Sequence, residues 1–219
     1  MISATAASNR VRTQISASTW GNVPIIELPD KAVIVVANHH EAVLALASHC
    51  AERREILIAH TERMDTILQE ELLAAGFTLV HGLGTSNQTL TRPPVAVPAE
   101  PGAVWLLTSG STDRPKRLRH TLSSLKTVTS WQPPRTWLCP YAPGSYAWWQ
   151  VLTLGLGHAD NHVVCIDSDE IDDWPKIALE QGVTAISGTP TFWRHAIWRD
   201  GPGVAALPLE QITLGGEPV

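Results

Sequence analysis

The residues best suited to chemistry lie close together in residues 106–120, LLTSGSTDRPKRLRH. An apolar run ends there, and a lysine, Lys116, follows a little later. Between them lie five small residues: Thr108, Ser109, Gly110, Ser111 and Thr112. Hydroxyl groups and the backbone N–H groups of a glycine-containing loop donate hydrogen bonds to phosphate oxygens, and a lysine adds a positive charge. The segment therefore indicates a phosphate-binding loop. The alternative is a strand-ending turn with solvated hydroxyls, because neither a Walker A nor a G-x-G-x-x-G spacing is present.

Two later segments bring further small and polar residues to places where apolar strands end. Residues 182–193, GVTAISGTPTFW, contribute Ser187, Gly188, Thr189 and Phe192. Residues 212–217, ITLGGE, contribute Gly215, Gly216 and Glu217. What these two segments do follows from a resemblance that they share with residues 108–116. Glu217 either orients a nucleotide-binding loop or is an exposed residue without a role.

These three segments carry a resemblance to a known family. Residues 108–116, TSGSTDRPK, resemble the [T/S]SG[S/T]TGxPK phosphate loop of the adenylate-forming enzymes, which include acyl- and aryl-CoA synthetases, luciferases and adenylation domains of nonribosomal peptide synthesis. Residues 182–193 resemble the family's strand-to-helix segment beside the acid pocket, and residues 212–217 resemble its GGE turn, whose backbone borders the adenine. All three occur in the family's order, so the resemblance covers residues 29–219.

The resemblance implies ATP and Mg²⁺ as cofactors and a reaction in two steps. A carboxylate attacks the α-phosphate of ATP, and the thiol of CoA or of an acyl carrier protein then takes the acyl group. The nucleotide would be held by Thr108, Ser109, Gly110, Ser111, Thr112, Lys116, Gly215, Gly216 and Glu217. The acid would be held by Tyr146, Trp148, Ser187, Gly188, Thr189 and Phe192, although core packing is the alternative for at least half of the aromatic side chains.

The nature of the acid follows from residues 140–146, PYAPGSY, which correspond to the family's substrate-selecting region. Members that activate amino acids carry an aspartate there, which pairs with the substrate ammonium group. This segment has no acidic residue, so we expect an aryl or aliphatic carboxylic acid rather than an α-amino acid.

Departures from the family pattern open a second interpretation. Asp113 stands where the family has a glycine, and a carboxylate would repel a triphosphate. The family's later segments, including its catalytic lysine, do not follow within the 219 residues, so no catalytic residue is assigned. We expect the N-terminal portion of a ligase, inactive alone, with a complementing C-terminal polypeptide or self-association. The alternative is a non-catalytic, degenerate homologue that acts as a binding or scaffold protein.

The elements that must position these residues alternate along the chain, which predicts an α/β fold with a layered, mainly parallel sheet flanked by helices. We expect an N-terminal arm at 1–28 with a short strand at 23–26, a first subdomain at 29–83, a Pro-rich linker at 84–102 and a second subdomain at 103–219. The expected strands are 32–37, 55–60, 77–82, 103–108, 135–140, 162–167, 184–188 and 211–216. The expected helices are 38–54, 61–76, 121–130, 145–158, 168–182 and 190–199, with Asn38, Thr61 and Ser168 as N-caps.

Composition limits the remaining function classes. A net charge of −5 gives no basic surplus for nucleic acid, and no apolar run is long enough for a membrane span. Three cysteines without CxxC spacing indicate reduced thiols, and we expect a cytoplasmic protein. We assign no metal site, because a cap, turn or surface role is favoured for the candidate ligands: His39, His40, His158, Asp160, His162 and the acidic residues of 167–173.

Overall fold

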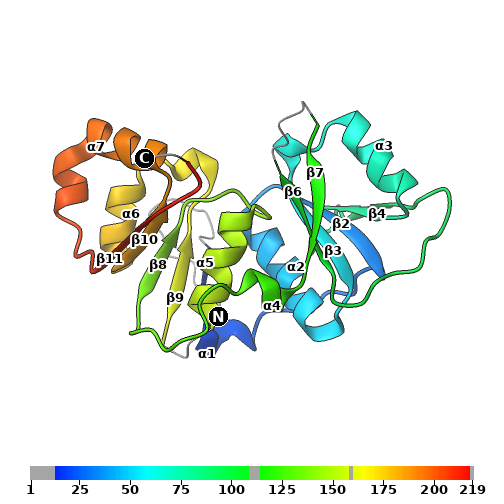
Figure 1. Cartoon of the computed structure of the whole chain (residues 1–219), viewed down its shortest axis with the longest axis horizontal. Helices are drawn as coiled ribbons and strands as arrows, with labels where there is room; N and C mark the ends of the chain where they lie inside the picture. Colours follow the sequence, from blue (N-terminus) through cyan, green and yellow to red (C-terminus); the bar gives the residue numbers. More distant parts are fainter. Residues whose placement is uncertain (1–12, 109–113, 158–159, 218–219) are drawn as a thin grey trace. The chain divides into compact units, whose positions relative to one another are not determined.

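The computed structural model describes residues 13–108, 114–157 and 160–217 (Figure 1). The chain forms two compact units, which are taken one at a time below. Unit 1 comprises Met1–Asn22, Thr127–Tyr141 and Ala147–Val219, and unit 2 comprises Val23–Lys126 and Ala142–Tyr146. Each unit contains its own sheet.

Unit 2 is built on a six-stranded sheet with the order β5-β4-β2-β3-β6-β7. The four inner strands β4, β2, β3 and β6 run parallel, and β5 and β7 pair antiparallel at the two edges. The strands are β2 (Lys31–Val36), β3 (Glu55–His60), β4 (Thr78–His81), β5 (Thr89–Thr91), β6 (Val104–Thr108) and β7 (Lys116–His120).

The inner strands of unit 2 are apolar in their central residues because both faces of the sheet are covered. Five of the six residues of β2 are buried. One face packs on a core that includes Leu57, Leu72 and Phe77, and the edge of the Trp105 ring contacts Phe77 at 6.4 Å between centroids. Parallel pairing of β6 with β3 brings the strand that precedes the hydroxyl-rich loop into this sheet. The contacts therefore place residues 103–126 in the same unit as residues 29–83. The linker expected at 84–102 lies between these two stretches in the sequence.

The helices of unit 2 begin at side chains that accept hydrogen bonds from free backbone N–H groups. Helix α2 (His39–Glu52) has the predicted N-cap, Asn38, whose side chain accepts from the N–H of Glu41 at 3.0 Å. The predicted start at Thr61 is wrong, because Thr61–Arg63 forms a 3₁₀ turn, η1, and Met64 leaves helical geometry. Helix α3 (Thr66–Ala74) begins instead at Asp65, which accepts from Leu68. Helix α4 is only Leu122–Leu125, shorter than predicted.

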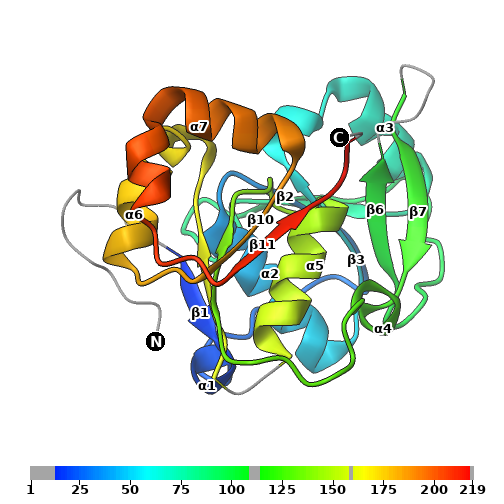
Figure 2. The ribbon, with the colours of Figure 1, turned by 60° about the vertical axis from the view of Figure 1, so that its left-hand side comes forward.

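Unit 1 is built on a five-stranded sheet with the order β1-β9-β8-β10-β11 (Figure 2). Strands β9, β8, β10 and β11 run parallel, and β1 pairs antiparallel with β9. The strands are β1 (Gln14–Ser16), β8 (Thr136–Cys139), β9 (His162–Cys165), β10 (Ala185–Gly188) and β11 (Gln211–Leu214). The helices are α1 (Ala17–Trp20), α5 (Tyr146–Leu156), η2 (Ser168–Glu170), α6 (Trp174–Glu180) and α7 (Pro190–Ala205), with the first residue of α5 counted in unit 2.

Two further expectations fail, one near the start of the chain and one in unit 1. The strand expected at 23–26 is absent, and the N-terminal strand is β1, nine residues earlier at its start. The helix expected from Ser168 is divided into η2, which follows Asp167, and α6, which follows Asp173. Proline at Pro175 favours a new first helical turn there. Both units nevertheless have the predicted α/β architecture with mainly parallel sheets. Within the described part of the chain, no helix is long and apolar enough to cross a membrane.

Candidate functional site

The hydroxyl-rich loop joins β6 to β7 in unit 2, so it lies at the carboxyl end of a parallel strand. Thr108 is the last residue of β6 and Lys116 is the first of β7, and the two are paired in register. The Thr108 hydroxyl donates to the backbone oxygen of Lys116 at 3.3 Å. Open α/β sheets bind ligands outside the carboxyl ends of their strands. Ser109, Gly110, Ser111 and Thr112 lie outside the described residues, as does Asp113.

Several cationic side chains surround the two ends of this loop. Lys116 is exposed. Arg114 is also exposed and donates to Glu71 at 2.7 Å. Arg63, which sequence reasoning missed, lies in η1 and donates to the backbone oxygen of Leu107 at 3.2 Å. The side chain of Arg63 thus reaches the end of β6, 44 residues later in the chain, and no local pattern in the sequence signals that contact.

The segment that resembles the acid-pocket segment occupies the junction of β10 and α7 in unit 1. Ser187 and Gly188 end β10, and Thr189 is the N-cap of α7, accepting from the N–H of Phe192 at 3.1 Å. The hydroxyl groups of Ser187 and Tyr141 share a hydrogen bond of 3.1 Å. Burial raises the pKa of Tyr141, so the phenol remains protonated at neutral pH. Tyr141 joins this group although it was not among the predicted site residues.

Gly188 is enclosed by aromatic rings. A Cβ atom at this position would lie 2.5 Å from Cδ1 of Phe192 and 2.8 Å from Nε1 of Trp193. Phe192 is partly buried, and its ring lies 5.3 Å from that of Trp174 between centroids. Nε1 of Trp193 is buried and has no hydrogen-bond partner among the described residues. The end of β10 thus presents small groups beside an apolar wall.

The GGE turn is tied to the start of α7. The Glu217 carboxylate accepts from the backbone N–H of Thr191 at 3.1 Å and from its hydroxyl at 2.6 Å. The hydrogen bond from the Thr191 hydroxyl, then that from its N–H, lowers the pKa of Glu217. Gly216 has a φ of 84°, which a residue with a side chain adopts with strain. Gly215, Gly216 and Glu217 therefore lie beside Thr189 and Thr191, as parts of one local arrangement in unit 1.

The two remaining predicted acid-binding residues have different surroundings. Tyr146 belongs to unit 2, is 43% exposed, and its ring lies 5.9 Å from that of His120 between centroids. Trp148 is fully buried in unit 1, with its ring against the edge of Trp149 at 5.1 Å. The burial of Trp148 is what core packing requires, whereas Tyr146 has surface that a ligand can reach.

Each unit by itself offers groups that suit part of a nucleotide. The hydroxyl of Thr108 and the exposed cations of Arg114 and Lys116 suit an anion at the end of β6. The Gly216 turn provides backbone that carries no side chain. Asp167 and Asp173 occupy the N-cap positions of η2 and α6, where a negative charge is favourable.

Comparison with known proteins shows the fold. No protein-family model and no curated protein sequence matches the chain, whereas many solved structures do. The N-terminal domain of FACL13 from Mycobacterium tuberculosis, with an inhibitor bound, has a TM-score of 0.64 and 13% identity over 93% of this chain and 60% of that one. The N-terminal subdomain of Klebsiella oxytoca NpsA, in complex with 3-hydroxyanthranilyl-AMSN, has a TM-score of 0.59 and 14% identity over 93% and 57%.

A third solved structure is that of a CoA synthetase. The o-succinylbenzoate CoA synthetase MenE of Bacillus subtilis, in complex with its acyl-adenylate intermediate, has a TM-score of 0.60 and 19% identity over 89% of this chain and 57% of that one. The match lies in the N-terminal domain of these proteins. The chain therefore has the N-terminal fold of the adenylate-forming enzymes and spans somewhat more than half of the length of these three solved chains.

Proposed function

We propose that this chain is the N-terminal portion of an ATP-dependent ligase that adenylates an aryl or aliphatic carboxylic acid, for transfer to the thiol of CoA or of a carrier protein. The observation that carries the proposal is the position of the hydroxyl-rich loop. It leaves β6 at the carboxyl end of a parallel sheet, in a chain with the adenylate-forming fold. That end of a parallel strand is where open α/β sheets bind ligands.

Binding and orientation are the main tasks of the residues in this proposal. ATP and Mg²⁺ supply an activated α-phosphate, with pyrophosphate as the leaving group. Lys116 holds phosphate oxygens at the end of β6, and Arg114 adds positive charge beside them. Thr108 joins them when its hydroxyl turns from the backbone oxygen of Lys116 to a phosphate oxygen. In-line displacement at phosphorus depends on positioning and charge neutralisation more than on covalent help. Gly215 and Gly216 present backbone to the nucleotide, and Glu217 fixes their turn through Thr191.

The acid is held at the junction of β10 and α7 in this proposal. The hydroxyl groups of Tyr141 and Ser187 offer polar contacts, and Phe192 offers an apolar wall. Because residues 140–146 contain no acidic side chain, nothing there pairs with an ammonium group. This favours an acid without an α-amino group. The chain spans somewhat more than half of the length of its structural neighbours, so the proposal assigns to these residues only the binding of the nucleotide and the acid.

A second candidate function is a non-catalytic binding or scaffold protein. It is favoured by Asp113, which replaces a glycine of the family's phosphate loop. A carboxylate near the phosphates weakens their binding by repulsion. The two candidates differ in whether Mg-ATP binds through the loop, so nucleotide affinity separates them.

The test is calorimetric titration of the purified chain with Mg-ATP. We expect binding that Lys116→Ala weakens by about tenfold, because the lysine is the point charge at the end of the loop. Lys126→Ala is the matched control, since Lys126 is an exposed lysine of the same unit at the end of α4, and its affinity should match that of the unchanged chain. Absence of binding to the folded chain, or equal affinities of the two variants, would contradict the nucleotide site.

The adenylation step itself has a separate measurement. Acid-dependent exchange between ATP and pyrophosphate is expected to be negligible with this chain alone. Exchange at an ordinary enzyme rate would show that residues 1–219 suffice and would remove the need for a complementing polypeptide.

A further inference from the structure

Two buried cysteines lie side by side in the sheet of unit 1. Cys139 ends β8 and Cys165 ends β9, and the two residues are register partners on these neighbouring parallel strands. Register partners on adjacent strands point to the same face of a sheet, so both thiols lie on one face. Their Sγ atoms lie within 4.8 Å of each other. The sequence indicated reduced thiols but not that two of them are neighbours, because they are far apart in the chain.

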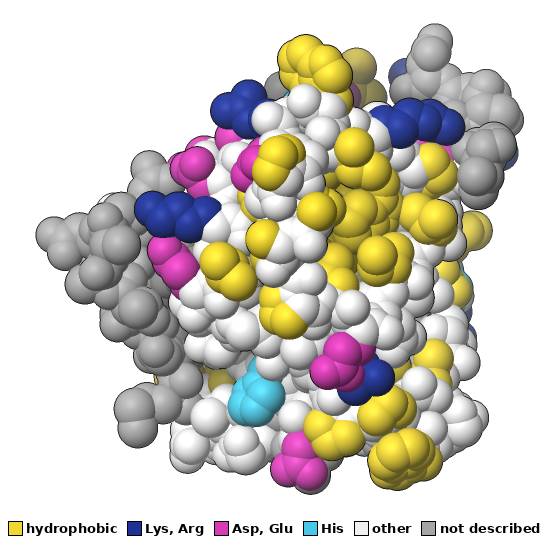
Figure 3. All heavy atoms as spheres, turned by 90° about the vertical axis from the view of Figure 1, so that its left-hand side faces the viewer, with side chains coloured by type: hydrophobic (Ala, Val, Ile, Leu, Met, Phe, Trp, Pro, Cys, Tyr) yellow, Lys and Arg dark blue, Asp and Glu magenta, His cyan; other side chains and the backbone are white. Residues whose placement is uncertain are grey.

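The face of the sheet that carries the two thiols packs against α5. Side chains alternate between the two faces along a strand, so Val163 shares the face of Cys165, whereas Val164 belongs to the other. Gly155 of α5 lies against Val163 so closely that a Cβ atom would not fit between them. The opposite face, with Val164, packs on α6 and α7, which lie on the side of the molecule that faces the viewer in Figure 3. The thiols are therefore enclosed between the sheet and a helix of the same unit.

Burial decides which oxidants suit this pair. Cys139 and Cys165 are 0% and 2% exposed. The hydrogen bond with the Cys139 thiol, and then burial, raises the pKa of the Cys165 thiol well above its ordinary value, so that thiol stays protonated at neutral pH. The thiolate is the reactive form of cysteine, so the pair reacts slowly. A small, uncharged hydroperoxide is better suited to reach it than a bulky, charged disulfide.

The spacing of the strands suits a covalent bond between the two sulfur atoms. Neighbouring strands lie about 4.8 Å apart, and the Cα atoms of disulfide-bonded cysteines are usually about 4.4–6.8 Å apart. Rotation of the two side chains can therefore join the sulfur atoms while both strands stay in place. We propose that Cys139 and Cys165 are a redox pair, in which a hydroperoxide converts the two thiols into a disulfide that cross-links β8 to β9. The pair includes none of the residues assigned to the nucleotide or the acid, so this inference does not depend on the proposed function.

The reaction balances with hydrogen peroxide as the oxidant. The sulfur of one cysteine attacks a peroxide oxygen, the O–O bond breaks, and the products are a sulfenic acid and one molecule of water. The sulfur of the second cysteine then displaces the hydroxyl group of the sulfenic acid. The S–S bond forms, and the hydroxyl group leaves with the thiol proton as a second molecule of water. The two cysteines together lose two electrons and two protons, and the peroxide is reduced.

The cross-link has a consequence for the stability of unit 1. It closes a loop that contains α5 and its two tryptophans, Trp148 and Trp149. A closed loop lowers the conformational entropy of the unfolded chain, which stabilises the folded state. The oxidised form should therefore keep the folded environment of both tryptophans to a higher urea concentration than the reduced form.

The test uses the full 219-residue chain with Cys50→Ser, because Cys50 is exposed and would cross-link separate molecules. The folded protein is treated with hydrogen peroxide, and catalase removes the excess. Thiols are then counted in denaturant, the intact mass is measured, and non-reducing electrophoresis separates monomers from linked chains. Two controls carry Cys50→Ser with either Cys139→Ser or Cys165→Ser, and circular dichroism shows that each protein is folded before treatment.

We expect the Cys50→Ser chain to lose both thiols together and to remain a monomer, with a mass lower by two hydrogen atoms. Dithiothreitol should restore both thiols. Neither control should show this loss of mass, and only the oxidised Cys50→Ser chain should gain a higher urea midpoint in the indole N–H resonances of Trp148 and Trp149. If one control is unfolded, the other control and the Cys50→Ser chain still give the comparison.

Three results would overturn the redox pair. The first is a folded Cys50→Ser chain that keeps both thiols throughout the treatment. The second is a chain that gains oxygen atoms instead of losing hydrogen, which would mean that each sulfur is oxidised alone. The third is a disulfide between separate molecules. A urea midpoint that does not rise on oxidation would contradict the stabilising effect of the cross-link.

Discussion

At the scale of single residues, Glu217 shows how a short motif gains its structure. Its carboxylate accepts two hydrogen bonds from Thr191, which lies 26 residues earlier in the chain. Both hydrogen bonds favour the ionised carboxylate, so the pKa of Glu217 is lower than in an unfolded chain. The contact is therefore fully present above the unfolded pKa and is lost as the pH falls through the folded one.

This link gives a pH prediction. In an NMR titration, the backbone amide resonance of Thr191 should shift with a midpoint below the pKa of a free glutamate side chain. Glu217→Gln should abolish that transition, because the amide side chain does not ionise, while the rest of the spectrum stays unchanged. A midpoint at or above the ordinary glutamate value would show that the hydrogen bonds do not stabilise the ionised form.

Gly144 gives a second prediction at the same scale. Its φ is 77°, and a Cβ atom there would lie 1.9 Å from the backbone oxygen of Ile58. Gly144→Ala therefore combines a strained backbone with a clash that no side-chain rotation relieves, and we expect a loss of about 2–4 kcal/mol in the free energy of unfolding. Urea denaturation measures this, with Gly201→Ala as the control because nothing lies within 4 Å of that position. Equal midpoints for the two variants would refute the steric argument.

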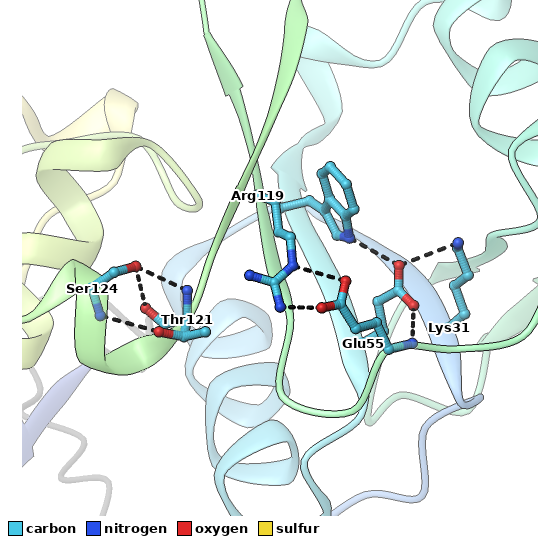
Figure 4. Close-up of polar contacts among 7 residues, drawn as sticks. Lys31, Glu55, Arg119, Thr121 and Ser124 are labelled. Atoms are coloured by element: carbon cyan, nitrogen blue, oxygen red, sulfur yellow. Dashed lines mark hydrogen bonds and ion pairs between the residues drawn. The ribbon is translucent and has the colours of Figure 1, made fainter.

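At the scale of elements, a buried carboxylate connects the strands that carry the hydroxyl-rich loop (Figure 4). Glu55, at the start of β3, accepts from Nε1 of Trp105 at 2.9 Å and from the N–H of Glu100 at 2.5 Å. Lys31 of β2 forms an ion pair with it at 3.2 Å. Arg119 of β7 in turn binds Glu100. One side chain thus links β2, β3 and β6 and, through Glu100, the outer strand of the hairpin.

The element prediction concerns Glu55→Gln. The glutamine keeps an oxygen for Trp105 but no charge for Lys31, whose side chain is 14% exposed. A partly buried ammonium group without its counter-charge is destabilising, so we expect a loss of about 2–4 kcal/mol in unfolding free energy. Glu71→Gln, which removes the exposed partner of Arg114, should cost less than about 1 kcal/mol. Similar losses in both variants would contradict the role assigned to burial.

Sequence reasoning found the elements whose signal is local. Strands β2 and β3 were predicted because strands that are covered on both faces have nearly continuous apolar sequences. Such a run can be recognised without knowing which strands lie beside it. The start of α3 was predicted wrongly because Thr61 and Asp65 are both good N-caps and local sequence does not choose between them. Strand β7 was missed because its sequence, KRLRH, is charged, as an edge strand permits.

The candidate site divides in the same way. The order and types of its residues could be recognised from three short motifs in the sequence. The contacts of Glu217 with Thr191 and of Tyr141 with Ser187 could not, because each joins residues that only the fold brings together. Trp148 was proposed as a binding residue from its type, yet its full burial depends on packing that periodicity does not reveal.

At the scale of the whole molecule, two units with separate sheets and separate cores share one chain. Trp105 is the one tryptophan of unit 2, whereas Trp148 and Trp149 belong to unit 1. Each unit therefore has its own indole reporter. Two compact units of one chain can unfold in separate steps.

The whole-molecule prediction uses these reporters in the Glu55→Gln variant. As urea is raised, the indole N–H resonance of Trp105 should lose its folded position first, while those of Trp148 and Trp149 persist. The measurement is a series of NMR spectra through the transition. Loss of all three resonances at one urea concentration would show that the two units unfold together.

The pairing of β1 with β9 also fixes the order in which the protein can be completed during synthesis. Ser16 is the register partner of His162, and Ile15, which is 1% exposed, faces the interior. A ribosome adding 5–20 residues per second needs on the order of ten seconds between these two points. During that interval most of unit 2 has already been made, while β1 emerges without its partner. The nascent chain therefore carries β1, with Ile15, unpaired until β9 has been made, and the sheet of unit 1 is completed after the strands of unit 2 have been synthesised.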